Sequence, residues 1–285
     1  MAVNHVHKIR ILSFFQDMFT LIFAGLIIAI SIATALFQSV RYTVKFLAFA
    51  ICLMVSGTIT SLIQIRNGRT PTNHFLMFKI FIASLWWSGL HADLRNHGPL
   101  EEDKPYVVIA NHQSAIDVFT LAAMWPWNCV VVLKKSLLFL PGFNLCAWLC
   151  NSIFIDRFSR EKAHKSLDDA LDQIKNHKRK VFLFPEGTRN SKDELLPFKK
   201  GAFLLAKEAN VPVLPVVFSR YKHFYNHDER RFDYGGKVVV ETLEPVHPAD
   251  FETIEALSDE CRRRMTAALD RLDIELGADA DKKAN

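Results

Sequence analysis

The chain lacks the cysteine patterns and glycosylation signals that mark several classes of protein. Its 285 residues include five cysteines, an odd number at irregular spacing and without a C-x-x-C pair. This is not the pattern of a disulfide framework, so the cysteines are expected to be reduced and mostly buried. No N-x-[ST] sequon indicates a glycosylated luminal domain. The histidines form no ligand-like cluster, so no metal is expected.

The chain also lacks a block of charge of one sign. The net charge of +5 comes from basic residues spread along the sequence, with no recognised nucleic-acid motif. Nucleic acid is therefore not expected as a partner, whereas anionic lipids or phosphate-bearing substrates are. Half of the residues are hydrophobic, and the mean hydropathy is slightly positive. This balance indicates a globular domain attached to a membrane.

Two long uncharged runs lie near the N-terminus, at residues 19–37 and 46–65. Each is about long enough to cross a hydrocarbon core of roughly 30 Å as a helix. The short link QSVRYTVK between them predicts a helical hairpin within residues 1–70, with the N-terminus and the large domain on one side. Flanking basic residues favour the cytoplasmic side only weakly. The alternative is a cleaved signal peptide ending near ATA at 33–35, although the run is long for that role.

Residues 71–90 form a connecting segment, and 75–90 (FLMFKIFIASLWWSGL) is apolar with paired tryptophans. It predicts either an amphipathic helix in the membrane interface or a core helix of the next domain. Residues 91–276 form the predicted catalytic domain, and residues 277–285 a polar tail.

Short apolar runs alternate with helical patterns from residue 91 onward. Strands are predicted at 106–110, 129–133, 152–156, 180–184, 213–218 and 237–242. Helices are predicted near 115–124, 137–149, 159–177, 199–209 and 250–276. The alternation indicates an α/β domain with a largely parallel open sheet flanked by helices. Sites in such sheets collect beyond the carboxyl ends of the strands.

The stretch ANHQSAIDVF places a histidine and an aspartate directly after a predicted strand. His112 and Asp117 would lie about 140° apart on a continuous helix and could not meet. If the helix begins at Ser114, His112 lies in the preceding loop and the Asp117 side chain can reach back to it. The alternative is an ordinary N-cap with an incidental histidine. No nucleophile elbow G-x-S-x-G is present, which favours transfer to a substrate hydroxyl over hydrolysis.

Two further stretches carry candidate anion-binding residues after strands. In FPEGTR, Pro185 ends the strand, Gly187 permits a left-handed turn, and Arg189 offers a planar fork for phosphate. The alternative is a solvated turn with a Glu–Arg ion pair. Arg157 follows another strand and either binds an anion or pairs with Asp156. The segment VPVLPVVF has prolines around a buried strand and is interpreted as a structural wall of an apolar site.

Four stretches, in this order, resemble the four motifs of the glycerolipid acyltransferase family, in particular its 1-acyl-sn-glycerol-3-phosphate acyltransferases. They are N-H-x4-D from Asn111 to Asp117, a block from Lys134 or Lys135 to FIDR at Arg157, FPEGTR at 184–189, and V-P-x-x-P-V at 211–216. They span about 106–218. The sequence departs from the family before FIDR, where LCNS replaces a step that is often rich in glycine.

The resemblance implies acyl transfer from acyl-CoA, or from an acyl-carrier protein, to the sn-2 hydroxyl of lysophosphatidic acid. His112 would be the general base and Asp117 would orient it and stabilise its charge. Backbone N–H groups at the start of the 115–124 helix are candidate oxyanion donors. No cofactor is implied beyond acyl-CoA as co-substrate.

The resemblance also implies a set of residues that bind the acceptor: Lys134, Lys135, Arg157, Glu186, Gly187, Thr188 and Arg189. The cationic side chains would hold the phosphate, and Glu186 and Gly187 would shape the loop. Other lysophospholipids or glycerol 3-phosphate remain possible acceptors. A thioesterase and a non-catalytic lipid-binding membrane protein are the further alternatives.

Both lipid substrates place the expected site at a membrane surface. Lys282 and Lys283, third and fourth from the C-terminus, resemble a dilysine retrieval signal that must face the cytosol. The sequence therefore predicts a protein of the endoplasmic reticulum membrane with a cytosolic catalytic domain.

Overall fold

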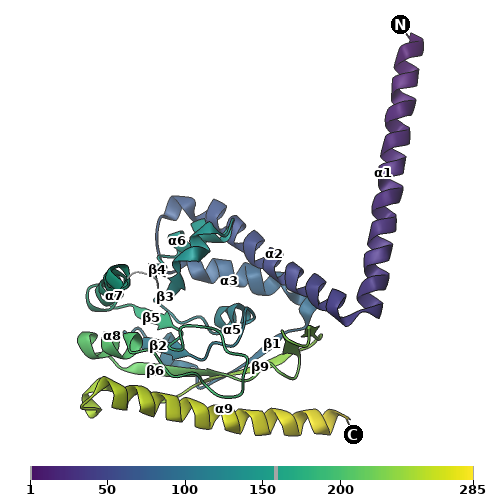
Figure 1. Cartoon of the computed structure of the whole chain (residues 1–285). Helices are drawn as coiled ribbons and strands as arrows, with labels where there is room; N and C mark the ends of the chain where they lie inside the picture. Colours follow the sequence, from purple (N-terminus) through teal and green to yellow (C-terminus); the bar gives the residue numbers. More distant parts are fainter. Residues whose placement is uncertain (1, 157–159, 285) are drawn as a thin grey trace.

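Six short apolar runs become strands of one sheet because their side chains are buried on both of its faces. In the computed structural model, which describes residues 2–156 and 160–284, seven strands form this sheet in the order β1-β9-β6-β2-β5-β3-β4 (Figure 1). The six predicted strands are all present, as β2 (Val107–Ala110), β3 (Cys129–Lys134), β4 (Ile153–Ile155), β5 (Lys180–Leu183), β6 (Val213–Phe218) and β9 (Lys237–Thr242). The predicted α/β class is confirmed.

The sheet is parallel except at one side. Strand β2 lies between β6 and β5, and the pairings from β6 through β2, β5 and β3 to β4 are all parallel. Strand β9 runs antiparallel to β6, and the edge strand β1 (His91–Arg95) pairs with β9. The carboxyl ends of five strands therefore meet at one edge of the sheet.

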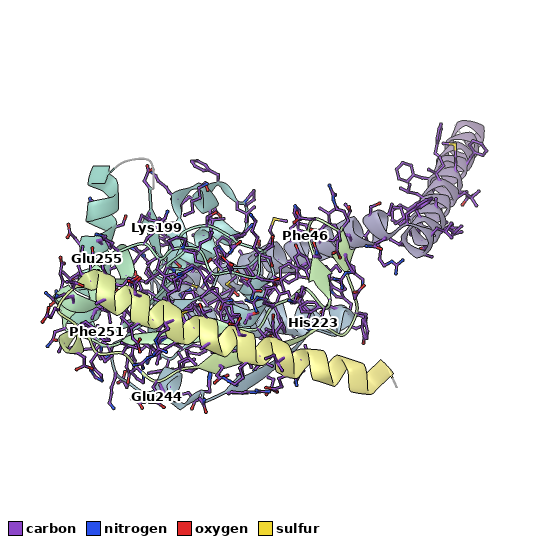
Figure 2. The ribbon with its side chains drawn as sticks, turned by 60° about the horizontal axis from the view of Figure 1, so that its bottom comes forward. Phe46, Lys199, His223, Glu244, Phe251 and Glu255 are labelled. Carbon is purple, nitrogen blue, oxygen red and sulfur yellow. The ribbon has the colours of Figure 1, made fainter. Side chains whose placement is uncertain are left out.

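Helices cover both faces of the sheet. One face packs against α7 (Arg160–Lys175), α8 (Gly201–Ala209) and α9 (Ile254–Ala284), and α9 extends across that face (Figure 2). The other face packs against α2 (Gln38–Gln64), α3 (Asn73–Ser84), α5 (Asp117–Met124) and α6 (Phe143–Leu149) (Figure 1). Along β2, Val107 and Ile109 face the first layer while Val108 and Ala110 face the second, as strand alternation requires.

Several short elements complete the described chain. They are α4 (Gly98–Glu101), the 3₁₀ turns η1 (Ile65–Asn67), η2 (Trp86–Ser88), η3 (Lys135–Phe139) and η4 (Pro248–Asp250), and a hairpin of β7 (Tyr225–Asn226) and β8 (Arg231–Phe232). The helix predicted at 137–149 is divided between η3 and α6, because Pro141 and Gly142 separate them. The helix predicted near 250–276 is α9, which begins at Ile254 and continues beyond the predicted end to Ala284.

The N-terminal helices differ from the predicted hairpin in where they turn. Helix α1 (Ala2–Leu36) meets α2 at the single residue Phe37, so the predicted link at 38–45 forms the first turns of α2. The link contains no glycine or proline to interrupt a helix. From this break α1 diverges from the rest of the molecule, while α2 lies along α3 and α6 (Figure 1).

Within the part of the chain that the structure describes, two segments are long and apolar enough to cross a membrane. They are Phe14–Leu36, which is unburied over its most apolar stretch, and Gln38–Asn67, which is 28% buried over its own. Within the next segment, α3 packs into the core through Met77, Phe78 and Phe81, while Phe75 and Ile82 are exposed on its other side. Beyond its end, Trp86 remains 81% exposed.

Candidate active site

The site is built from loops that leave the carboxyl ends of neighbouring parallel strands. His112 follows β2, the FPEGTR turn follows β5, and Tyr221 follows β6. These three strands are adjacent in the sheet, in the order β6-β2-β5. Their loops are therefore brought together by the pairing, as expected for an open parallel sheet.

The predicted His–Asp pair is in contact. The Nδ1 atom of His112 lies 2.6 Å from Oδ2 of Asp117, and Asp117 is buried. The same carboxylate accepts hydrogen bonds from the backbone N–H groups of Gln113, at 2.8 Å, and Ser114, at 3.2 Å to either oxygen. Since Nδ1 faces the carboxylate, Nε2 is the nitrogen left to meet a substrate hydroxyl.

The sequence analysis considered a helix that begins at Ser114, but the structure differs. Helix α5 begins at Asp117, and the Ser114 hydroxyl accepts a hydrogen bond from the Ile116 N–H at 3.0 Å within the preceding turn. The Asp117 carboxylate reaches back over this turn, as expected. The Ile116 N–H, at the start of the predicted 115–124 helix, is bonded to the Ser114 hydroxyl, and the Gln113 and Ser114 N–H groups just before it are bonded to Asp117. These three N–H groups are therefore not available as oxyanion donors.

The loop after β5 holds His112 from two further sides. The His112 ring stacks on the Phe184 ring, with the ring centroids 3.9 Å apart and the ring planes at 12° to each other. The His112 N–H donates to Oε1 of Glu186 at 2.8 Å, and the His112 carbonyl accepts from the Asn190 N–H at 2.8 Å. His112 is therefore fixed through its ring and both backbone groups.

Asn111, the first residue of the N-H-x4-D motif, links the end of β2 to the end of β6. Its side-chain oxygen accepts from the Phe218 N–H at 2.8 Å, and its amide donates to the Phe218 carbonyl at 2.9 Å. Gln113, which the sequence did not single out, adds amide bonds at 3.1 Å to the carbonyls of Phe218 and Ser219. Both amides position the loop that carries His112.

Glu186 is a buried structural carboxylate rather than the solvated partner of Arg189. Its two oxygens accept the N–H groups of His112, at 2.8 Å, and Leu196, at 3.0 Å. Burial raises the pKa of Glu186 above its ordinary value, while these two hydrogen bonds act in the opposite direction. Gly187 adopts a positive φ of 69°, and a Cβ there would lie 2.7 Å from Cε and Nζ of Lys199. Both observations fit the predicted left-handed turn.

The predicted cationic residues are less closely assembled. Thr188 and Arg189 are exposed, and Arg189 has no ion-pair partner among residues 14–156 and 165–277, whose side chains the structure describes. Lys134 and Lys135 are exposed at the end of β3, where Nζ of Lys135 lies 3.7 Å from Oδ2 of Asp156. Arg157 lies outside the described residues, so its predicted position is not tested.

Tyr221 is a site residue that the sequence analysis missed. Its hydroxyl lies 2.9 Å from Oγ1 of Thr120 on α5, and the side chain is buried. Burial, followed by the charge of Asp117, raises the pKa of Tyr221 well above its ordinary value. The phenol is therefore neutral and lies beside the carboxylate, in a position that no local spacing reveals.

An apolar cavity of about 250 Å³ lies beside the FPEGTR turn, between the sheet and helices α7 and α8. Its lining includes Val132, Ile155, Leu167, Leu183, Phe184 and Leu205, with Lys199 among the few polar residues. Phe184 thus contacts the His112 ring and also bounds the cavity. The predicted wall at 211–218 contains the buried strand β6, but none of its residues lines this cavity.

Comparisons with known proteins match this arrangement. Residues 91–219 match the family described as Acyltransferase. The Caenorhabditis elegans protein acl-1, whose name places it with the 1-acyl-sn-glycerol-3-phosphate acyltransferases, is 47% identical over 87% of this chain and 95% of its own length. The human 1-acyl-sn-glycerol-3-phosphate acyltransferase beta is 35% identical over 76% of this chain and 78% of its own.

A solved structure has the same fold. The crystal structure of the 1-acyl-sn-glycerophosphate acyltransferase PlsC from Thermotoga maritima superposes with a TM-score of 0.68. The superposition covers 83% of this chain and 98% of that one, at 24% sequence identity. This similarity shows the fold, whereas membership of the family is shown by the two relatives that are 47% and 35% identical in sequence.

Proposed function

Since this chain belongs to the 1-acyl-sn-glycerol-3-phosphate acyltransferases and is an enzyme of that kind, we propose that it transfers an acyl chain from acyl-CoA to the sn-2 hydroxyl of lysophosphatidic acid. The products are phosphatidic acid and CoA. The observation that carries the proposal is the 2.6 Å contact between His112 Nδ1 and the buried carboxylate of Asp117. It leaves Nε2 as the nitrogen that can take a proton.

The proposed mechanism needs no nucleophile from the protein. Nε2 of His112 accepts the proton of the acceptor hydroxyl as its oxygen attacks the thioester carbonyl. The new C–O bond forms, the C–S bond breaks, and the departing thiolate receives the proton from His112. Asp117 stabilises the imidazolium between these two transfers. Since Phe184, Glu186 and Asn190 already fix His112, the base needs little rearrangement before reaction.

The acceptor phosphate is proposed to bind at the cationic residues of the same edge. Arg189 supports this because it is exposed close to the fixed loop and has no acidic partner among the described residues. Lys134, Lys135, Arg157 and Thr188 are proposed to assist, while Glu186 and Gly187 shape the loop. The headgroup is therefore held by side chains that are distinct from the base.

The enzyme is proposed to work at a membrane surface, because both substrates are amphipathic. Segments Phe14–Leu36 and Gln38–Asn67 supply the apolar attachment. The proposed membrane is that of the endoplasmic reticulum, with the catalytic domain in the cytosol.

A thiol-release assay with purified protein and oleoyl-CoA tests the function. Lysophosphatidic acid is compared with lysophosphatidylcholine, with glycerol 3-phosphate and with no acceptor. We expect release with lysophosphatidic acid, its loss in His112→Ala, and a raised KM for the acceptor in Arg189→Ala. Equal release without acceptor would indicate a thioesterase, and stronger release with another acceptor would reassign the substrate.

A further inference from the structure

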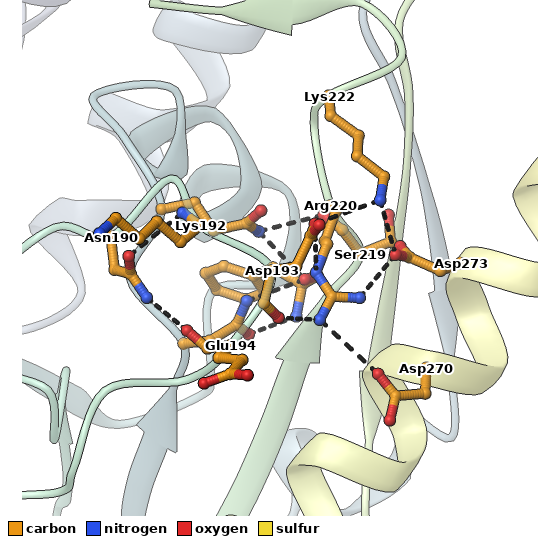
Figure 3. A network of polar contacts seen from close by, with 12 residues as sticks. Asn190, Lys192, Asp193, Glu194, Ser219, Arg220, Lys222, Asp270 and Asp273 are labelled. Carbon is orange, nitrogen blue, oxygen red and sulfur yellow. Dashed lines mark hydrogen bonds and ion pairs between the residues drawn. The ribbon is translucent and has the colours of Figure 1, made fainter.

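A cluster of charged side chains joins three segments that are far apart in the sequence (Figure 3). This Arg220 cluster consists of Asp193 in the loop after Arg189, Arg220 and Lys222 after β6, and Asp270 and Asp273 on α9. Its members bring the FPEGTR loop, the end of β6 and the C-terminal helix together.

Arg220 makes the central contacts. Its Nη1 lies 2.6 Å from Oδ2 of Asp273, and its Nε lies 3.5 Å from Oδ1 of Asp193. Nη2 also donates to the Asp193 backbone carbonyl. Lys222 Nζ lies 3.2 Å from each of the same two carboxylates, which closes a ring of alternating charges. Arg220 thus fixes both the side chain and the backbone of Asp193.

The side chains of the cluster differ in how far they are buried. The side chain of Arg220 is only 11% exposed, and Asp273 is 20% exposed. Asp270, at 3.7 Å from Arg220, is 63% exposed and lies at the periphery. A guanidinium that is buried and engaged by carboxylates is not free to bind a substrate phosphate. Its position points instead to a role in holding the loop.

The loop held in this way connects directly to the catalytic histidine. The Asn190 N–H donates to the His112 carbonyl at 2.8 Å, and the Leu196 N–H donates to Glu186 at 3.0 Å. From α9, Arg262 donates to the Leu195 carbonyl at 2.7 Å. The segment 190–196 has no regular secondary structure. Apart from the hydrogen bonds that the Asn190 side chain makes to Lys192 and Glu194, these contacts from outside the segment hold its shape.

We infer that Arg220 is a positioning residue for acceptor binding. Through Asp193 and Asp273 it fixes the 190–196 loop against α9, and it thereby places the exposed Arg189 at the start of that loop. Helix α9 is then part of the acceptor site's support. This inference rests on the proposed role of Arg189 in binding phosphate.

The test compares steady-state kinetics of Arg220→Gln with the unaltered full-length enzyme. Misplacing a binding group by about 1 Å costs up to roughly 100-fold in rate. We therefore expect KM for lysophosphatidic acid to rise by roughly 10- to 100-fold, while kcat stays within a few fold. Arg220→Lys keeps the charge without the planar fork and should fall between the two. As a control, Arg263→Gln removes an α9 arginine that is 69% exposed and bonded to Glu260, and should change neither constant.

A double variant with Arg189→Ala distinguishes a positioning role of Arg220 from a merely structural one. If Arg220 acts through Arg189, then Arg220→Gln should add no further rise in KM to Arg189→Ala. Independent, multiplied effects in the double variant would overturn the inference. So would a lower melting temperature of Arg220→Gln with an unchanged KM. An unchanged KM in Arg189→Ala itself would instead refute the phosphate assignment on which the inference rests.

Asp273→Asn provides the same test from the α9 side if Arg220→Gln does not fold. The substitution keeps the shape of the side chain and removes the charge that faces Arg220 at 2.6 Å. We expect KM for lysophosphatidic acid to rise in the same direction by a smaller factor. A folded Asp273→Asn variant with an unaltered KM would remove α9 from the acceptor site and refute the inference.

Discussion

Asp117→Asn tests the His112–Asp117 pair most directly, because it removes a charge while keeping the shape of the side chain. Oδ2 of Asp117 accepts from the His112 ring at 2.6 Å and from the Gln113 N–H at 2.8 Å, while Oδ1 accepts from Ser114 at 3.2 Å. Because Oδ2 has more donors, the asparagine oxygen should take its place and leave the NH₂ group facing Ser114. The ring is then still held, but by a neutral acceptor.

The expected loss follows from this geometry. A hydrogen bond to a charged group contributes about 1.5–3 kcal/mol, and its loss in the transition state lowers kcat by about 10- to 150-fold. If the amide turns its NH₂ group toward Nδ1 instead, the wrong tautomer of His112 is selected. The corresponding change in a Ser-His-Asp triad lowers kcat by about 10⁴-fold. We therefore expect kcat to fall by about 10- to 10⁴-fold, with little change in the acceptor KM.

The assay measures initial rates of CoA release at saturating oleoyl-CoA over a range of lysophosphatidic acid concentrations. Asp250→Asn, at an exposed position in η4, controls for the loss of one negative charge. Asp117→Asn should also lose about 1 kcal/mol of stability, since the carboxylate caps backbone N–H groups. A kcat within threefold of the unaltered enzyme, at comparable stability, would refute the general-base reasoning. A double variant with His112→Ala should be no slower than His112→Ala alone.

Two further predictions concern the support of the site. Burial raises the pKa of Glu186, so the folded state holds its proton more tightly than the unfolded state, and this favourable contribution is lost as pH rises through the raised pKa. We therefore expect the free energy of unfolding of Glu186→Gln, measured in urea from pH 4 to 7, to rise relative to that of the unaltered enzyme as the pH increases. Parallel pH profiles of the two proteins would contradict this. In Gly57→Ala, the new Cβ would lie 2.7 Å from the Gly142 carbonyl, which should cost about 1–3 kcal/mol in thermal unfolding. Gly25→Ala has nothing within 4 Å and should melt as the unaltered protein does.

The central strands could be predicted because burial on both faces leaves long apolar runs in the sequence. Strand β2 is the extreme case, with all four residues buried. Strand β1, with the sequence HADLR, was missed because it is an edge strand that is half exposed and carries charges. Its strand conformation comes from pairing with β9, more than 140 residues away along the chain, and no local pattern records that pairing.

The contact between His112 and Asp117 could also be predicted, for a local reason. A carboxylate in the first turn of a helix can reach the preceding loop, so the spacing of His112 and Asp117 already carries the contact. Arg220 offers no such signal, because its partners Asp193 and Asp273 lie 27 and 53 residues away. Tyr221, whose hydroxyl partner is 101 residues distant, was missed for the same reason.

The two sets of contacts around the site are joined at few points, which is why kcat and KM should separate. The contacts of Asp117 and Phe184 act on the His112 ring itself. The Arg220 cluster acts on the 190–196 loop, which reaches His112 through the Asn190 N–H bond to its carbonyl and through Glu186. A displaced loop can therefore move Arg189 by rotating about its own residues while the ring stays against Asp117. Conversely, neutralising Asp117 changes the basicity of the ring without moving the loop, so its effect should appear in kcat.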